Sequence, residues 1–483
     1  MSTALVWFRR DLRLADNPAL AAALARHEQV IPVFVHAPAE EAPWPPGAAQ
    51  RVWLHHSLAA LDGTLRASGS RLLLRHGPSL AALRRLVAEA EASAVYWNRL
   101  YEPAVTARDR AIKQALRADG LEAESFNAAL LAEPWTLQTR QAAPYRVYTP
   151  FARALRQLAI ETPQPAPRRL PAVPGTLLSE PLDSLELLPR QPWDRALIAH
   201  WQPGENGAGQ TLRRFLEQGL AGYREGRNLP GEPFVSRLSP HLHFGEIGPR
   251  QLWHAVQSRA AGAPATGLAA GAETFLDELI WREFAHHLLY HFPHTPEQPL
   301  DARFARFPWA DNEGALAAWQ RGRTGIPIVD AGMRELWQTG WMHNRVRMIV
   351  ASFLTKNLLL PWQHGARWFW DTLLDADLAN NTLGWQWTAG CGADAAPYFR
   401  IFNPVLQGAR FDAQGRYVRR WVPELCRLPD RWLHQPWVAP AVELAAAGVK
   451  LGVDYPLPLA DLAKTRARAL AAYATLRELA PGR

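Results

Sequence analysis

WMHNRVRMIVASFL, residues 341–354, follows a glycine and repeats apolar side chains at helical spacing. Projected at 3.6 residues per turn, one helix face carries an apolar stripe that must be buried, formed by Val346, Ile349, Val350, Phe353 and Leu354. The roughly opposite face carries four residues at i, i+3, i+4 and i+7, namely Asn344, Arg347, Met348 and Ala351. That face is typical of neither a solvated surface nor a core. We expect it to form the wall of a cavity that holds something large, flat and partly polar.

Downstream, DADLANNTLGWQWTAG (375–390) brings carboxylates, amides and indoles together, and three interpretations compete for it. Asp375 and Asp377 could ligate a metal, but no further carboxylates or histidines follow at ligand spacing, so we predict no metal. Asp377 could simply cap a helix. We favour a third interpretation, in which a carboxylate pairs with Arg347 while carboxylates and amides line a nitrogen heterocycle.

A second helix is predicted in AETFLDELIWREFAHHLL (272–289), where a broad apolar arc leaves a narrow wedge. The wedge carries Glu278, Trp281, Arg282 and the small Ala285. Glu278 and Arg282 could form only an i, i+4 surface ion pair. Alternatively the wedge faces a pocket, where Glu278 hydrogen-bonds a nucleobase edge and Trp281 offers a stacking face.

The segment 220–253 combines hydroxyl groups with arginines near a predicted helix start. It could be a serine-rich helix cap, or it could seat the pyrophosphate of a dinucleotide. Its candidate residues are Tyr223, Arg227, Ser236, Arg237, Leu238 and Ser239.

Short apolar runs alternate with helical stretches through the first part of the chain, at 4–10, 29–36, 70–76, 93–99 and 123–127. This rhythm predicts a doubly wound, parallel α/β sheet over 1–130. No GxGxxG follows the first run, which argues against the usual dinucleotide fingerprint. Proline-rich text such as ETPQPAPRRLPAVPG then predicts a long connector over 131–204 without regular structure. Helical periods dominate 205–483, which we expect to be a large all-α domain.

Composition limits the partners and the compartment. The formal charge of +8 favours a polyanionic partner, although a merely soluble basic protein would also fit. Two cysteines outside any CxxC indicate a reducing cytoplasm. Because there is no signal sequence and no apolar run near about 18 residues, we expect neither secretion nor membrane insertion.

Several long motifs, in the same order nearly end to end, resemble the photolyase and cryptochrome family. They are VWFRRDLRL (6–14), DELIWREF (277–284), YFRIFNPVLQG (398–408) and YVRRWVPEL (417–425). The resemblance implies FAD, folded into a U in the helical domain and driven by blue light, with an antenna-type domain over 1–130. Matching flavin-contact positions are Tyr223, Ser236, Arg237, Leu238, Ser239, Arg282, Asn344, Arg347, Asp375, Asp377 and Asn381. Arg227, Phe275 and Glu278 complete the expected cofactor-binding set, although Phe275 replaces a family tryptophan and Val235 stands where a hydroxyl is common.

Within the family, the pocket indicates the substrate. Asn344 and Met348 stand where the branch that repairs (6-4) photoproducts carries histidines, so the chain is similar to a cyclobutane pyrimidine dimer photolyase. The expected dimer-binding residues are Glu278, Trp281, Asn344, Arg345, Met348 and Trp387. The implied partner is ultraviolet-damaged DNA, single- or double-stranded, whose damaged dinucleotide is flipped out. Excited FADH⁻ would donate an electron to it, while Glu278 stabilises the dimer and Asn381 faces flavin N5 and favours reduced flavin.

Other implied features are an electron relay and an antenna. Trp385, Trp362 and Trp309 match the family's tryptophan chain, although each alone could be a packing residue. Ala104 and Val105 replace the Asn-Glu pair of folate-binding members, and His243 replaces a deazaflavin-site lysine, whereas Arg51 matches. A second chromophore therefore stays open, with its identity unknown. We expect a cytoplasmic monomer without an obligate protein partner. The alternatives are a cryptochrome-like blue-light receptor and a flavin-containing DNA-binding protein without catalysis.

Overall fold

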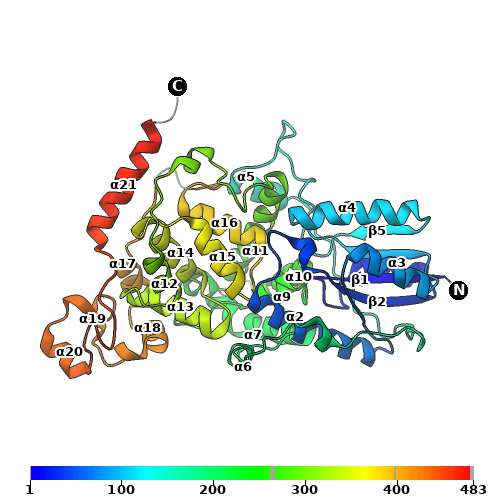
Figure 1. Cartoon of the computed structure of the whole chain (residues 1–483), viewed down its shortest axis with the longest axis horizontal. Coiled ribbons are helices and arrows are strands. Elements are labelled where there is room, and N and C mark those ends of the chain that lie inside the picture. Colours follow the sequence, from blue (N-terminus) through cyan, green and yellow to red (C-terminus); the bar gives the residue numbers. More distant parts are fainter. Residues whose placement is uncertain (1, 262–266, 396–398, 479–483) are drawn as a thin grey trace.

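The first part of the chain forms a parallel sheet covered by helices, on the right of Figure 1. The computed structural model describes residues 2–261, 267–395 and 399–478. The strands are β1 (Thr3–Phe8), β2 (Gln29–His36), β3 (Leu73–His76), β4 (Ala94–Asn98) and β5 (Glu122–Phe126). Their order is β3-β2-β1-β4-β5, and every neighbouring pair is parallel. The predicted strands and the doubly wound α/β sheet are confirmed, with the order reversing beside β1, where such folds open a crevice.

Four α-helices lie between these strands. They are α1 (Pro18–Arg26), α2 (Ala48–Ala67), α3 (Ser79–Glu89) and α4 (Pro103–Ala118). In α1, the Asn17 side chain accepts a hydrogen bond from the Leu20 amide at 3.1 Å, and Pro18 occupies the first helical position. Proline is tolerated there because its missing N–H would have no partner within the helix.

The region between the sheet and the helical part is less irregular than predicted. The stretch 161–175, all of it within the described residues, forms neither helix nor strand, as expected from its prolines. However, α5 (Tyr148–Leu155) precedes it and α6 (Asp194–Ile198) follows it. The prediction that 131–204 lacks regular structure was therefore wrong at both ends, because the apolar Phe151 and Leu155 give α5 a face that it buries. The domain boundaries themselves stay a prediction.

The rest of the described chain consists of helices joined by loops, with an isolated bridge between Leu451 and Tyr455. The helices are α7 (Glu205–Arg214), α8 (Tyr223–Gly226), α9 (Ser239–His243), α10 (Pro249–Ala261), α11 (Leu268–His291), α12 (Glu313–Gln320), α13 (Pro327–Thr339), α14 (Asn344–Ser352), α15 (Trp362–Thr372), α16 (Leu378–Ala389), α17 (Pro404–Phe411), α18 (Arg416–Trp421), α19 (Asp430–Leu433), α20 (Ala441–Ala447) and α21 (Leu462–Glu478). Within the described ranges, no helix combines the length and the apolar character needed to cross a membrane.

The start of α14 is set by two local features. Gly340 ends α13 with a φ of 66°, in the left-handed region that favours glycine. His343 then caps α14, because its Nδ1 accepts a hydrogen bond from the Arg345 amide at 3.2 Å. These two residues fix the direction in which the polar face of α14 points.

The sheet and the helical part share buried contacts. Phe244 and Leu374 belong to the same hydrophobic cluster as β1 and α2. The Trp53 indole donates to Glu246 at 2.9 Å. Arg13, which is 1% exposed, donates to the carbonyl groups of Gly245 at 2.9 Å and Ala128 at 2.9 Å. A buried guanidinium needs such acceptors, so these bonds tie the two parts of the chain together.

Candidate functional site

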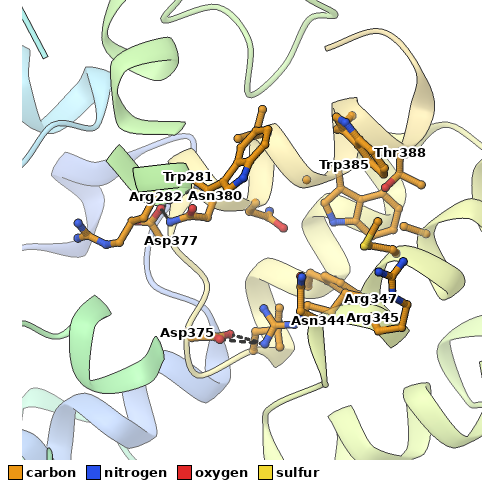
Figure 2. A pocket seen from close by; sticks show the side chains of 18 of the residues that line it. Trp281, Arg282, Asn344, Arg345, Arg347, Asp375, Asp377, Asn380, Trp385 and Thr388 are labelled. Atoms are coloured by element: carbon orange, nitrogen blue, oxygen red, sulfur yellow. Dashed lines mark hydrogen bonds and ion pairs between the residues drawn. The ribbon is translucent and has the colours of Figure 1, made fainter. Parts of the chain in front are cut away.

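A cavity of about 550 Å³ opens among α11, α14, α15 and α16. Figure 2 shows Trp281 and Arg282 of α11 on one side of it and Arg345 and Arg347 of α14 on the other. The cavity brings together thirteen of the predicted site residues, namely Arg227, Glu278, Trp281, Arg282, Asn344, Arg345, Arg347, Met348, Asp375, Asp377, Asn381, Trp385 and Trp387. Its size and its mixture of aromatic and polar walls are typical of a cofactor site.

The polar face of α14 is one wall of this cavity. Asn344, Arg347, Met348 and Ala351 all line it, as predicted. The opposite stripe is buried, with each of Val346, Ile349, Val350, Phe353 and Leu354 at most 1% exposed. Helical spacing thus separated the core face from the cavity face correctly.

Arg347 forms an ion pair with Asp375 in the cavity wall, drawn as dashed lines in Figure 2, so Asp375 is the carboxylate predicted to pair with this arginine. One guanidinium nitrogen of Arg347 donates to both Asp375 carboxylate oxygens, at 3.0 and 2.8 Å. A second nitrogen, Nε, donates to the Met342 carbonyl at 2.7 Å. The Asp375 carboxylate is therefore committed to arginine. Within the part of the chain that the structure describes, no group of three or more His, Cys, Asp or Glu side chains could hold a metal ion.

Asp377 both caps a helix and lines the cavity. Its Oδ1 accepts hydrogen bonds from the amide and the side chain of Asn380, at 2.8 and 2.7 Å, which begins α16. Its Oδ2 lies 3.3 Å from His286 Nε2. Burial raises the pKa of Asp377, but the lowering by His286 and Arg282 is larger, so the pKa lies well below its ordinary value. Burial lowers the pKa of His286, but Asp377 raises it more, so an ionised pair is favoured.

Glu278 does not pair with Arg282, so the surface ion-pair interpretation was wrong. Glu278 instead pairs with Arg227, just after α8. Arg282 Nη1 donates to the Ala129 carbonyl at 2.7 Å. Burial raises the pKa of Glu278, and Arg227 lowers it only in part. Its carboxyl group therefore keeps a proton more readily than an exposed glutamate, which suits it to donate a hydrogen bond.

Trp281 lines the cavity and carries a second ring on its other side. Its indole stacks on Tyr148 of α5, with ring centroids 3.7 Å apart and planes 1° apart. Ala285, expected to leave room in the same wedge, instead lies in the core and is 1% exposed. The wedge that faces the cavity is therefore narrower than predicted.

The α16 wall supplies Asn381 and Trp385. Asn381 Nδ2 donates to the Ala366 carbonyl at 3.0 Å, which leaves its side-chain oxygen available. Gly384 also lines the cavity, and a Cβ added there would meet nothing within 4 Å. The glycine thus keeps that part of the cavity open. With the carboxylates and amides nearby, this wall suits the edge of a nitrogen heterocycle such as a flavin.

The expected relay tryptophans occupy one hydrophobic cluster. Trp385 and Trp362 are buried, at 2% and 1% exposure, and Trp309 is half-buried against the same cluster. Trp385 lines the cavity. The relay itself stays a prediction.

The expected phosphate seat lies beside the cavity. Among the described residues, those that line the cavity do not include Tyr223, Ser236, Arg237, Leu238, Ser239, Phe275, Trp309 and Trp362. Trp341 connects the seat to the α14 wall, because its indole donates to Ser239 Oγ at 3.2 Å and lies 5.9 Å from the Arg347 guanidinium. Arg237 lies over the same indole at 4.7 Å. The cofactor role of these residues stays a prediction.

Several residues of the site were missed. The cavity is also lined by Phe369, Leu373, Ala376, Asn380, Leu383, Thr388, Asp394 and Arg400. Arg400 lies 5.8 Å from the Trp387 ring and could have been found, because it belongs to a motif that carries the family resemblance. His286 and Tyr148 had no local signal, since each acts through a residue far away in the sequence.

A smaller cavity of about 270 Å³ lies where the sheet meets the helical part. Ala104 and Val105 line it together with Trp44, Glu102 and Trp370. These are the positions at which the sequence lacks the folate-binding pair. The cavity is large enough for part of a second chromophore, whose identity these residues leave open.

Comparison with known proteins gives two family models. Residues 4–170 match "DNA photolyase", and residues 275–475 match "FAD binding domain of DNA photolyase". The helical part therefore contains an FAD-binding domain, as predicted, and the α/β part is of the photolyase type.

Relatives and solved structures agree with these models. A deoxyribodipyrimidine photo-lyase from Agrobacterium fabrum is 50% identical over 476 residues, which cover 98% of each chain. Cryptochrome-1 from Arabidopsis thaliana is 42% identical, over 96% of this chain and 69% of that protein. The crystal structure of a class III photolyase from Agrobacterium tumefaciens matches with a TM-score of 0.95 and 50% identity, over 99% of this chain and 98% of that one. A photolyase from Sulfolobus tokodaii with two FAD molecules matches with a TM-score of 0.81 and 30% identity, over 98% and 100% of the two chains. The chain belongs to the photolyase and cryptochrome family.

Proposed function

We propose that this protein repairs cyclobutane pyrimidine dimers in ultraviolet-damaged DNA, using light absorbed by bound FAD. One observation supports this most directly. The expected flavin-binding residues Arg347, Asp375 and Asn381 line the same cavity as the expected dimer-binding residues Glu278 and Trp281. A flavin and a flipped dinucleotide held there would be neighbours, which short-range electron transfer requires.

FAD in its fully reduced form, FADH⁻, would supply the light absorption and the electron. The chain's own residues would bind and orient this cofactor. Arg347 and Asp375 would offer a paired cation and anion to the cofactor, and Asn381 lines the same cavity. The pKa of Asp377 is well below its ordinary value because His286 and Arg282 outweigh the effect of burial, so its ionised carboxylate would accept a hydrogen bond from a ring N–H. The seat with Arg237 and Ser239 would hold the pyrophosphate.

On the lesion side, Glu278 and Trp281 have separate tasks. The Glu278 carboxyl, oriented by Arg227, would donate a hydrogen bond to a carbonyl of the dimer and stabilise the negative charge that develops on it. Trp281 would stack on a base. Arg345 and Arg400 at the same cavity would hold the flanking phosphates.

The dimer type rests on two residues of α14. Asn344 and Met348 line the cavity where the (6-4)-repairing branch is expected to carry histidines. Relatives named deoxyribodipyrimidine photo-lyase favour the same substrate.

The test is repair of ultraviolet-damaged oligothymidylate by the reduced, flavin-loaded protein under blue light. Repair is measured as the recovery of thymine absorbance. Glu278→Ala should weaken binding of the damaged strand by up to about tenfold, the upper end of what one hydrogen bond between neutral groups contributes, and should lower the repair yield. Its flavin content should stay nearly unchanged. Glu273→Ala, an exposed glutamate on the same helix, is the control. No recovery of absorbance by reduced wild-type protein would remove the repair proposal, and loss of flavin from Glu278→Ala would place Glu278 in the cofactor site.

A cryptochrome-like photoreceptor is the second candidate, because Cryptochrome-1 of Arabidopsis thaliana is 42% identical. A receptor would bind the same flavin but leave the damaged strand unchanged under light. A flavin-containing DNA-binding protein would bind DNA equally in light and dark.

A further inference from the structure

Tyr148 is the first residue of α5, in the stretch that links the sheet to the helical part, and its ring lies flat on Trp281. The two ring planes are 1° apart with centroids 3.7 Å apart, whereas Phe284 meets both rings edge-on at 6.0 and 5.9 Å. One face of the Trp281 indole is therefore covered by Tyr148. The residue as a whole still lines the cavity.

Tyr148 is held in place from two directions. Its hydroxyl donates to the Asp277 carbonyl at 3.1 Å and lies 3.2 Å from Asp277 Oδ1. Asp277 is itself bound by Arg156 of the same α5 region at 2.7 Å. Asp394, a cavity-lining residue, accepts a hydrogen bond from the Tyr148 backbone amide.

The rest of α5 anchors this arrangement. Phe151 and Leu155 are buried, and they share a hydrophobic cluster with Phe284 and Ile280 of α11. Tyr148 thus cannot leave Trp281 without disturbing packing behind it. The stretch predicted to be an irregular connector thus contributes a fixed ring behind Trp281, a residue of the cavity wall.

We propose that Tyr148 is a positioning residue for the damaged DNA, which acts by holding the Trp281 indole in one orientation. This inference rests on the proposed repair function. Trp281 is half-buried, and without a ring behind it the indole would sample other rotamers and would bring water to its back face. With Tyr148 in place, the indole presents one ready surface to a flipped base. Holding a contact residue in its bound orientation improves affinity because less freedom is lost on binding.

The experiment compares the affinity of the flavin-loaded protein for ultraviolet-damaged and undamaged oligothymidylate in the dark. Tyr148→Ala should weaken binding of the damaged strand by about two- to tenfold, the range expected from the interaction of one stacked aromatic pair. Binding of the undamaged strand and the flavin content should not change. Tyr148→Phe keeps the stacked ring and should restore most of the discrimination. Tyr148→Leu keeps apolar volume without a flat ring, so it should lower the affinity for the damaged strand by the same two- to tenfold range. It takes the place of Tyr148→Ala in the comparison if Tyr148→Ala folds poorly.

A double-mutant cycle separates positioning from a general structural effect. In a Trp281→Ala background, Tyr148→Ala should have no further effect on damaged-strand affinity, because the residue through which it acts is gone. Tyr145→Ala is the matched control, since Tyr145 lies in the same stretch and its ring packs on Phe151 and His287 instead.

Four results decide the outcome. Additive effects in the cycle, or equal losses from Tyr145→Ala and Tyr148→Ala, would overturn the positioning role. An unchanged discrimination in both Tyr148→Ala and Tyr148→Leu would also overturn it. A wild-type protein that binds both strands equally would instead contradict the repair proposal itself.

Discussion

The ion pair between Arg347 and Asp375 allows a quantitative test of how much the cavity wall contributes to stability. Asp375→Asn keeps the shape of the side chain but removes its charge and one of its two acceptor oxygens. Asp375 is 4% exposed at its side chain and Arg347 is 23% exposed. The variant therefore loses one charge-assisted hydrogen bond, which is worth about 1.5–3 kcal/mol, and water reaching Arg347 recovers part of it. We expect the free energy of unfolding to fall by about 2 kcal/mol.

The matched control is Asp119→Asn. Asp119 also accepts two hydrogen bonds from one arginine, Arg84, at 2.7 and 3.0 Å. That pair is exposed, at 49% and 37%, and should contribute too little to separate its variant from the wild type. The two substitutions are chemically identical, so their difference isolates burial.

The assay is urea unfolding followed by circular dichroism. Because weaker FAD binding would lower stability as well, unfolding is measured at two FAD concentrations. A difference between variant and wild type that is independent of FAD concentration belongs to the ion pair. If Asp375→Asn and Asp119→Asn changed stability equally, the reasoning from burial would be refuted.

Three further predictions concern pH, light and salt. His286 has a raised pKa, so its pairing with Asp377 stabilises the protein fully below about pH 6.5 and is lost as the pH rises through the raised value; the stability difference between wild type and His286→Gln should therefore shrink above pH 6.5, and a constant difference would contradict this. Trp385→Phe should block photoreduction of oxidised flavin, while the chemically reduced variant should still repair. Trp319 is a buried neighbour of Trp385, with ring centroids 6.1 Å apart, and the control variant Trp319→Phe should keep both photoreduction and repair. Affinity for DNA should fall steeply with salt, and Arg345→Gln should reduce the slope of log affinity against log salt by about 1; a flat response would argue against phosphate contacts.

Local periodicity explains why the α14 wall was predictable. The stretch 341–354 separates apolar from polar residues at helical spacing. In the structure the apolar face is buried and the polar face lines the cavity. The pairing of Arg347 with a carboxylate was also predictable, because a cavity-facing arginine needs a carboxylate nearby, but the sequence left open whether the partner was Asp375 or Asp377. The strands followed from short apolar runs between turn signals.

Tertiary contacts explain what was missed. Glu278 has an arginine four residues on, but its partner is Arg227, which another segment brings to it. Helical spacing reports neighbours only within one helix. For the same reason the motif around Ser236 gave no sign of whether it faces the cavity. The helix α5 was hidden because eight residues beside proline-rich text give little periodic signal.

The buried junction between the sheet and the helical part has a consequence for light harvesting. Arg13 and Trp53 lock the two parts together through hydrogen bonds that water cannot easily replace. Any pigment held beside the strands would then keep a constant distance and angle to the flavin. Excitation transfer between them would be a fixed property of the architecture, so a viscous solvent, which slows hinge motion, should leave its efficiency unchanged.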